Sequence, residues 1–549
     1  MKKKDLSNTT FSRRDFLYGS TIPPLAAAGL SGCSFNQKSG GEPPEKDYSF
    51  ELDEISIREL SQGLQNGKYS SEGITRLYLE RIENLDHQGP ELHAIIETNP
   101  DALQIARELD EEMKEKGPRG PLHGIPVVVK DNIDTHDGMT TTAGSLALEG
   151  SIPARDSEVA MRLKDAGAII LAKANLSEWA NFRSFSSSSG WSGRGGQCRN
   201  PYILDRSPCG SSSGSAVAIS ANLCPVAIGT ETNGSILCPS NANGIVGIKP
   251  TVGLVSRRGL VPISHNQDTA GPMARTVADA VALLNIISGA DPEDSFTKDA
   301  ETKGQPDYTE FLNPEGLQGK RLGVAREFFE FHPKVEAVME TALADLKKMG
   351  AVLVDPVEFP DNYELGSASF NVLLYDFRVD LEEYLRGLPG ENTPRTLAEL
   401  IAFNEANRDR EMPWFEQEIF LKAEETKTVS EADYLKDLKK IQDFYRVEGI
   451  DKLMDEHKLD AIIAPSGGPA WTIELLYGDH GGGGSSSPAA RSGYPNITVP
   501  AGYIHGLPVG ISFFGRAWSE ALLIETAYAY EQGTGHRKPP TFLDTLKWD

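Results

Sequence analysis

The hydrophobic and polar positions of the chain follow two different periods. From Ile55 to about Glu115, apolar residues recur every three or four positions among Glu, Arg and Lys, a pattern that predicts helices. Five short apolar runs farther along the chain predict buried strands at residues 125–130, 166–173, 225–229, 459–465 and 508–514. Because such runs alternate with helical segments, the sequence predicts an α/β fold with a mostly parallel sheet.

Two segments interrupt this alternation. From about residue 362 to residue 458 the pattern is helical and strongly charged, which predicts a helical cap beside the sheet. Residues 481–487 are four glycines followed by three serines, which predicts a flexible loop that either lines a site or only connects two elements. We interpret residues 51–549 as one domain that includes the cap.

The N-terminus has the features of an export signal. Arg13 and Arg14 precede Phe-Leu and a short apolar run, and resemble a twin-arginine signal. Leu30-Ser-Gly-Cys33 resembles a bacterial lipobox, in which the cysteine is acylated and becomes the mature N-terminus. These residues predict a signal peptide over 1–33, lipidation at Cys33 and a flexible tether over 34–50. The alternative is an ordinary terminus with a chance pair of arginines. We expect an exported, periplasmic or extracytoplasmic protein that a lipid anchors to a membrane.

Composition narrows the classes of partner. The chain has 549 residues, of which 39% are hydrophobic and 24% are charged, as in a soluble globular enzyme. Its formal net charge of −25 repels phosphate backbones, which argues against a nucleic-acid partner. Beyond Cys33 there are four cysteines without metal-binding spacing, which we expect to be small buried hydrophobic residues: Cys198, Cys209, Cys224 and Cys238.

Lys130 is the first candidate for chemistry. It ends the apolar run 125–130, and a lysine that is held among β-branched residues loses hydration, which lowers its pKa. A neutral amine of this kind can act as a general base. The alternative is a strand-end lysine that reaches into solvent.

Two serine-containing turns are the other candidates. Residues 207–216 place Ser211, Ser212 and neighbouring hydroxyls beside glycines, ahead of an apolar run. In residues 229–239 a strand leads into Thr232-Asn233-Gly234-Ser235, a turn that exposes a hydroxyl and directs consecutive N–H groups toward one point, as an oxyanion hole requires. Alone, the first is equally well read as a surface loop and the second as an ordinary helix cap.

Together the three segments resemble the amidase signature family, and the resemblance continues over 244–256, 268–276 and 494–510, so that it covers about residues 55–538. It implies the amidase signature fold, with a large mixed, mostly parallel sheet covered by helices on both faces. It also implies a Ser–cis-Ser–Lys triad in which Lys130 is the base, Ser211 the bridge and Ser235 the nucleophile. The Gly210–Ser211 peptide bond would be cis.

The resemblance further implies an oxyanion hole from the N–H groups of Thr232, Asn233, Gly234 and Ser235, an acyl-enzyme intermediate, and no metal or cofactor. The chain departs from the usual motif at Cys209, where the family has glycine, and in Glu231-Thr-Asn-Gly-Ser235, where the family has Asp-Thr-Gly-Gly-Ser. We expect Asn233 to keep the turn because asparagine tolerates left-handed backbone. These changes, with Trp179, Asn181 and residues 191–194, resemble the bacterial peptide amidase branch, which implies C-terminal peptide amides as substrates and small amides as the next choice.

Other interpretations remain open from the sequence. Residues 210–214 also fit GxSxG, which would make the protein a serine esterase with Ser212 as nucleophile. A catalytically silent binding lipoprotein on the same scaffold is a second alternative. A glutaminase-like subunit of a tRNA amidotransferase is a third, and the export signal argues against it because its tRNA is cytoplasmic. We expect residues 481–487 and 412–415 to shape the entrance to the site, and the sequence leaves the oligomeric state open.

Overall fold

The computed structural model describes residues 48–360, 365–390 and 393–547. The predicted signal peptide, its Cys33 and the tether up to residue 47 lie outside the described residues. Among the helices that are described, none has the length and the apolar character needed to cross a membrane.

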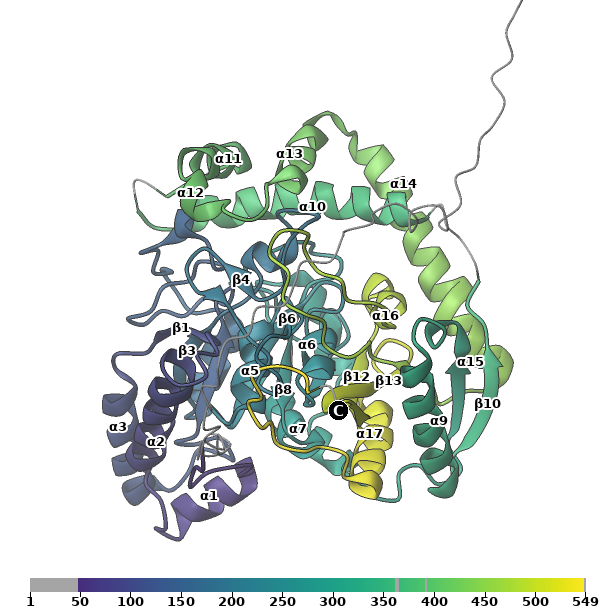
Figure 1. Cartoon of the computed structure of the whole chain (residues 1–549), viewed down its shortest axis with the longest axis horizontal. Helices are drawn as coiled ribbons and strands as arrows, with labels where there is room; N and C mark the ends of the chain where they lie inside the picture. The colour runs from purple at the N-terminus through teal and green to yellow at the C-terminus, as the bar shows by residue number, and fades with distance from the viewer. Residues whose placement is uncertain (1–47, 361–364, 391–392, 548–549) are drawn as a thin grey trace, which may run out of the picture. The chain divides into compact units, whose positions relative to one another are not determined.

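An eleven-stranded mixed sheet forms the centre of residues 50–549 (Figure 1). In spatial order its strands are β1 (Ile95–Thr98), β3 (Ile169–Ala174), β2 (Pro126–Lys130), β6 (Val226–Glu231), β8 (Thr269–Ala274), β7 (Val246–Lys249), β12 (Asn496–Ile504), β13 (Leu507–Phe514), β11 (Ala461–Pro465), β9 (Arg321–Ala325) and β10 (Val352–Val357). All five strands that the apolar runs predict are present.

The prediction that the sheet is mostly parallel is wrong. Four of the pairings between neighbouring strands are parallel and six are antiparallel. One cause is the tight turn at His505 and Gly506, whose positive φ angles of 49° and 82° return the chain directly and make β12 and β13 an antiparallel hairpin. Another cause is β8, which pairs antiparallel with both β6 and β7. The sequence pattern does not predict this strand because it contains Gly271 and Pro272, which are rare inside strands.

Helices lie on both faces of the sheet. Neighbouring residues of a strand point to opposite faces, and Phe513 of β13 packs on Tyr530 of α17 (Glu520–Thr534), whereas Phe514 packs in a cluster with Ala489 of α16 (Ser486–Ser492). The helices α4 (Glu158–Asp165), α7 (Val277–Ile287) and α9 (Pro333–Lys348) lie in the layer of α17. Helix α5 (Ser213–Ser220) contacts β2 and β6, the strands that carry or precede the candidate residues, and α6 (Leu237–Ala242) contacts β7, β12 and β13.

The N-terminal region differs from the predicted all-helical pattern at one place. It contains α1 (Ile57–Gln65), α2 (Ser71–Ile82) and α3 (Ala102–Lys116), but β1 lies between α2 and α3. Residues 95–98 are too few for a helical or a strand period to be read from them with certainty, and the edge of the sheet recruits them.

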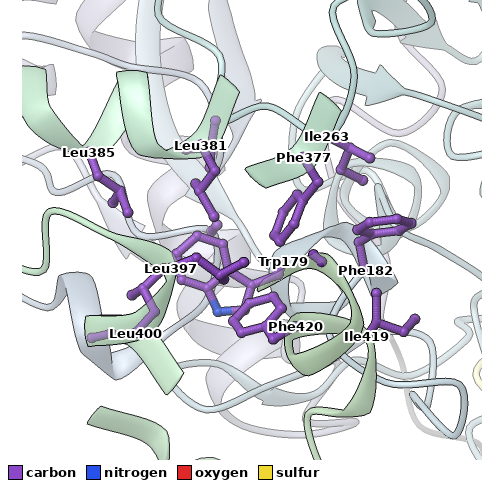
Figure 2. Packing of buried hydrophobic residues seen from close by; sticks show 14 of the residues in the cluster. Trp179, Phe182, Ile263, Phe377, Leu381, Leu385, Leu397, Leu400, Ile419 and Phe420 are labelled. Carbon is purple, nitrogen blue, oxygen red and sulfur yellow. The ribbon is translucent and has the colours of Figure 1, made fainter. Parts of the chain in front are cut away.

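The charged segment after residue 362 is helical in its described part. It contains α10 (Leu365–Gly387), α11 (Leu397–Ala406), α12 (Arg408–Glu411), α13 (Glu418–Glu425), α14 (Glu431–Gln442) and α15 (Lys452–His457), and the first five gather at the top of Figure 1. Figure 2 shows how α10, α11 and α13 bury leucines and phenylalanines against Trp179, Phe182 and Ile263. This apolar packing joins the segment to the loops that surround the candidate site.

Candidate active site

Lys130 is buried at the end of β2, an interior strand between β3 and β6. Its Nζ lies 2.8 Å from the Ser211 hydroxyl and 2.9 Å from the Thr230 hydroxyl. Burial lowers the pKa of Lys130 to about 7, although the charges of Asp268 and Glu231 oppose this shift. The amine is therefore half neutral near pH 7 and can take up a proton, and the alternative of a solvent-exposed lysine is wrong.

Ser211 lies on the loop before α5 and is fully buried. The Gly210–Ser211 peptide bond is cis, as the resemblance implies. Its neighbour Ser212 donates its hydroxyl to the Thr230 carbonyl at 3.0 Å and accepts the Thr230 N–H at 3.2 Å. These bonds occupy Ser212 with the strand backbone, and no histidine of the described chain is among its partners, so the geometry gives no support to Ser212 as an esterase nucleophile.

Ser235 lies on the turn between β6 and α6. The Ser212 N–H donates to the Ser235 carbonyl at 3.1 Å, which holds the two serine loops side by side. Glu231 fixes the far side of the turn, because its carboxylate accepts the N–H groups of Ile236 and Leu237 at 2.8 and 3.0 Å. Left-handed backbone occurs at Gly234, with φ 84°, and not at Asn233 as expected.

Four successive backbone donors of this turn have no hydrogen-bond partner among the described residues. Among the hydrogen bonds between described residues, none uses the N–H of Thr232, Asn233, Gly234 or Ser235. Free N–H groups on one turn are what an oxyanion hole requires. None of those hydrogen bonds involves the Ser235 hydroxyl either, so among the described residues Lys130 is bonded to Ser211 and Ser211 is not bonded to Ser235.

A disulfide joins the two serine loops. Cys209, two residues before Ser211, is bonded to Cys238, three residues after Ser235. The prediction that these two cysteines are only small buried hydrophobic residues is wrong, because the fold brings a loop and a helix that are 29 residues apart within bonding distance. Cys198 and Cys224 are buried free thiols, as predicted.

The predicted site does not include three polar residues that lie around Lys130 and the Ser235 turn, namely Asn132, Thr230 and Asp268. Asn132 Nδ2 donates to the Thr230 hydroxyl at 3.0 Å, and the Thr232 hydroxyl donates to Asp268 at 2.6 Å. Burial raises the pKa of Asp268 to about 6. Asn132, Thr230 and Asp268 lie in or directly beside the segments that resemble the family motifs. Only the fold shows that their side chains gather around the lysine. Within the described ranges, no group of three or more His, Cys, Asp or Glu side chains is placed to hold a metal ion.

One of the two predicted entrance segments, residues 481–487, contacts these loops. Ser486 donates its hydroxyl to Asn233 Oδ1 at 2.8 Å, and Asn233 Nδ2 donates to Ser487 at 3.2 Å, so the glycine-serine segment contacts the turn that carries Ser235. Phe415 packs edge-on against Trp191, and the buried guanidinium of Arg183 stacks on the Phe415 ring. That these segments form an entrance stays a prediction.

Comparison with known proteins gives one consistent result. The family model described as Amidase matches residues 73–524. A probable amidase of Arabidopsis thaliana is 45% identical over 506 residues, which cover 90% of this chain and 93% of the plant protein. A glutamyl-tRNA(Gln) amidotransferase component of Gloeothece citriformis is 34% identical, over 88% of this chain and 99% of that protein.

Solved structures agree with the sequence relatives. A peptide amidase in complex with the competitive inhibitor chymostatin is 50% identical, with a TM-score of 0.86, over 89% of this chain and 100% of that one. The native peptide amidase of Stenotrophomonas maltophilia is 49% identical, with a TM-score of 0.85, over 90% of this chain and 100% of that one. An amidase family protein of Bacillus anthracis is 37% identical, with a TM-score of 0.81, over 89% and 93% of the two chains.

Proposed function

Because this chain belongs to the amidase signature family of amide-hydrolysing enzymes, we propose that it removes the C-terminal amide of peptides through Ser235, Ser211 and Lys130. The observation that carries the proposal is the 2.8 Å contact between a fully buried lysine amine and the Ser211 hydroxyl, on a loop that is bonded to the Ser235 loop. A buried amine in that place can serve as a base for Ser211.

The proposed reaction begins when neutral Lys130 takes the Ser211 proton and Ser211 takes the proton of Ser235. The Ser235 oxygen then attacks the amide carbon, and the free N–H groups of the turn stabilise the negative oxygen; losing one donor of this kind typically costs about 3 kcal/mol of transition-state stabilisation. The proton returns through Ser211 to the leaving nitrogen, and water cleaves the acyl-enzyme.

Peptide amides are the first choice of substrate. Two peptide amidase structures are about half identical to this chain over almost their whole length, and one holds a competitive inhibitor. Ser486 of the glycine-serine segment places a hydroxyl beside the Ser235 turn, where it can bond to a peptide backbone.

The test compares purified wild-type protein with Ser235→Ala and Lys130→Ala on a set of short peptide amides, with mass spectrometry of the product acid and an assay of released ammonia. We expect the wild type to turn over peptide amides, Ser235→Ala to show no turnover, and Lys130→Ala to lose several orders of magnitude in rate. Near-normal hydrolysis by either variant contradicts the triad.

Two further assays, one with free glutamine and one with a labelling probe, separate the alternative functions. Free glutamine tests the amidotransferase-like activity that the relatives of 34% identity suggest. A fluorophosphonate probe that fails to label Ser235 would favour the silent binding protein. Export and lipid attachment at Cys33 rest on the sequence alone and stay predictions.

A further inference from the structure

A small cavity lies beside Ser211. The space open to the centre of a water molecule is about 10 Å³, which is room for one non-hydrogen atom and its hydrogens. Polar side chains line one part of it: Asn132, Ser211, Thr230, Thr232 and Asp268. The rest is apolar wall, including Val261 and Ile263.

Most of the polar groups of this cavity are already bonded within the chain. The Thr230 hydroxyl meets Lys130 and Asn132 Nδ2, and Asp268 accepts the Thr232 hydroxyl and the backbone N–H groups of residues 263 and 264. The exception is Asn132 Oδ1, which is buried and has no partner among the described residues. An unpaired buried acceptor costs free energy until a donor reaches it.

The proposed reaction requires a donor at this place. When the C–N bond breaks, the nitrogen must take its proton from Ser211, so the leaving nitrogen has to lie within hydrogen-bonding reach of the Ser211 hydroxyl. Ser211 is one of the residues that line the cavity. An NH₂ group carries two N–H donors, and after protonation it leaves as ammonia, a molecule with one heavy atom.

We propose that this cavity is the leaving-group site, that Asn132 Oδ1 accepts an N–H of the leaving nitrogen, and that the size of the cavity restricts the enzyme to primary carboxamides. The inference rests on the proposed Ser–Ser–Lys mechanism. In the balanced step the Ser235 Oγ–carbon bond forms, the carbon–nitrogen bond breaks, and the nitrogen gains the Ser211 proton and departs as ammonia. Ser211 is restored by the proton that Lys130 holds.

The apolar wall sets this limit because it cannot move freely. Ile263 belongs to the cluster that α10, α11 and α13 build around Trp179 (Figure 2). Packed side chains of such a cluster leave few voids, so the wall yields little to an additional methyl group. The helical segment thereby acts on substrate choice through a residue that touches the cavity.

The decisive experiment compares one peptide as its C-terminal amide and as its C-terminal N-methylamide. For the wild type we expect kcat/KM to be at least about 100-fold higher for the primary amide. Ile263→Ala enlarges the cavity and should reduce this ratio at least about tenfold. Leu381→Ala is the matched control: Leu381 is buried in the same cluster but does not line the cavity, so the ratio should keep its wild-type value.

Asn132→Leu tests the proposed acceptor at nearly constant volume. We expect kcat for the primary amide to fall at least about tenfold with KM little changed, because the bond to the leaving nitrogen strengthens as the nitrogen departs. A circular dichroism melt that matches the wild type shows that the fold is kept.

The outcomes separate the two proposals. Equal turnover of both amides by the wild type, or a ratio that Ile263→Ala leaves unchanged, overturns the leaving-group site while the amidase function stands. If the cavity holds only a structural water, Ile263→Ala leaves the ratio unchanged. Turnover of neither amide overturns the proposed function, and the leaving-group site with it.

Discussion

Titrating the purified enzyme tests whether Lys130 is the base. Only the neutral amine can accept a proton, and burial gives Lys130 a pKa of about 7 in place of its usual 10.5. The neutral fraction is then about one-eleventh at pH 6 and about ten-elevenths at pH 8, so kcat/KM should rise about tenfold over this range. With the usual pKa, less than about 1% of the amine would be neutral at pH 8.

Removing a negative charge near Lys130 should shift the pH profile of the enzyme in a predictable direction. The negative charges of Asp268 and Glu231 both raise the pKa of Lys130, in opposition to burial. Glu231→Gln removes one of them and keeps an acceptor for the N–H groups of residues 236 and 237. The pKa of Lys130 should therefore fall, and the rise of kcat/KM should move to lower pH. Glu111→Gln, on the exposed side of α3, is the control and should not move it.

The assay is ammonia release from a peptide amide between about pH 5 and pH 10 at constant ionic strength, with kcat/KM fitted to a single ionisation. A profile that stays flat from about pH 6 to pH 9, or that rises only near pH 10, refutes Lys130 as a base of lowered pKa. A Glu231→Gln profile that moves to higher pH refutes the electrostatic account of the site.

The remaining predictions address single features. Ser235→Ala should abolish ammonia release while its thermal melt matches the wild type. The pair Cys209→Ser and Cys238→Ser, or reduction by a dithiol, should lower the free energy of unfolding by about 3–4 kcal/mol in a denaturant titration, because the disulfide closes a loop of about 30 residues. Phe420→Ala should cost about 3–5 kcal/mol in the same titration, since the ring is fully buried in the cluster of Figure 2. Cys33→Ala should move the protein from the membrane fraction to the soluble fraction of the cells that export it.

For Lys130 the local pattern predicts a buried lysine of lowered pKa, but it leaves a strand-end lysine in solvent as the alternative. The β-branched run 125–130 predicts a buried strand, and a lysine at its end loses its hydration for the same reason that the valines before it are buried. The two serines needed the joint resemblance, since each turn alone fits an ordinary loop. The structure explains their proximity: β6 lies beside β2 in parallel, and the loops at the ends of these strands meet at Lys130.

Pairings between distant segments could not be read from local patterns. The direction of β7 and β8, the recruitment of β1 and the Cys209–Cys238 bond all depend on which segments the finished fold makes neighbours. The sequence also could not predict that Asn132 Oδ1 is buried without a partner among the described residues. Whether a buried acceptor has a partner depends on its surroundings and not on its own residue type.

The departures from the usual family motif have a common physical consequence. Cys209 has the left-handed φ of 57° that glycine would adopt without strain, and its bond to Cys238 holds the loop there. Glu231 binds the first N–H groups after the nucleophile, and Asn233 exchanges hydrogen bonds with Ser486 and Ser487. Each substituted residue thus fixes the turn of Ser235 or the loop of Ser211, within the turn at Glu231 and to another segment at Cys209 and Asn233. Since stabilisation of an oxyanion by N–H donors depends on fixing them before the substrate arrives, the attachments at Cys209 and Asn233, where the family has glycine, and at Glu231, where it has Asp, favour the same preorganised turn.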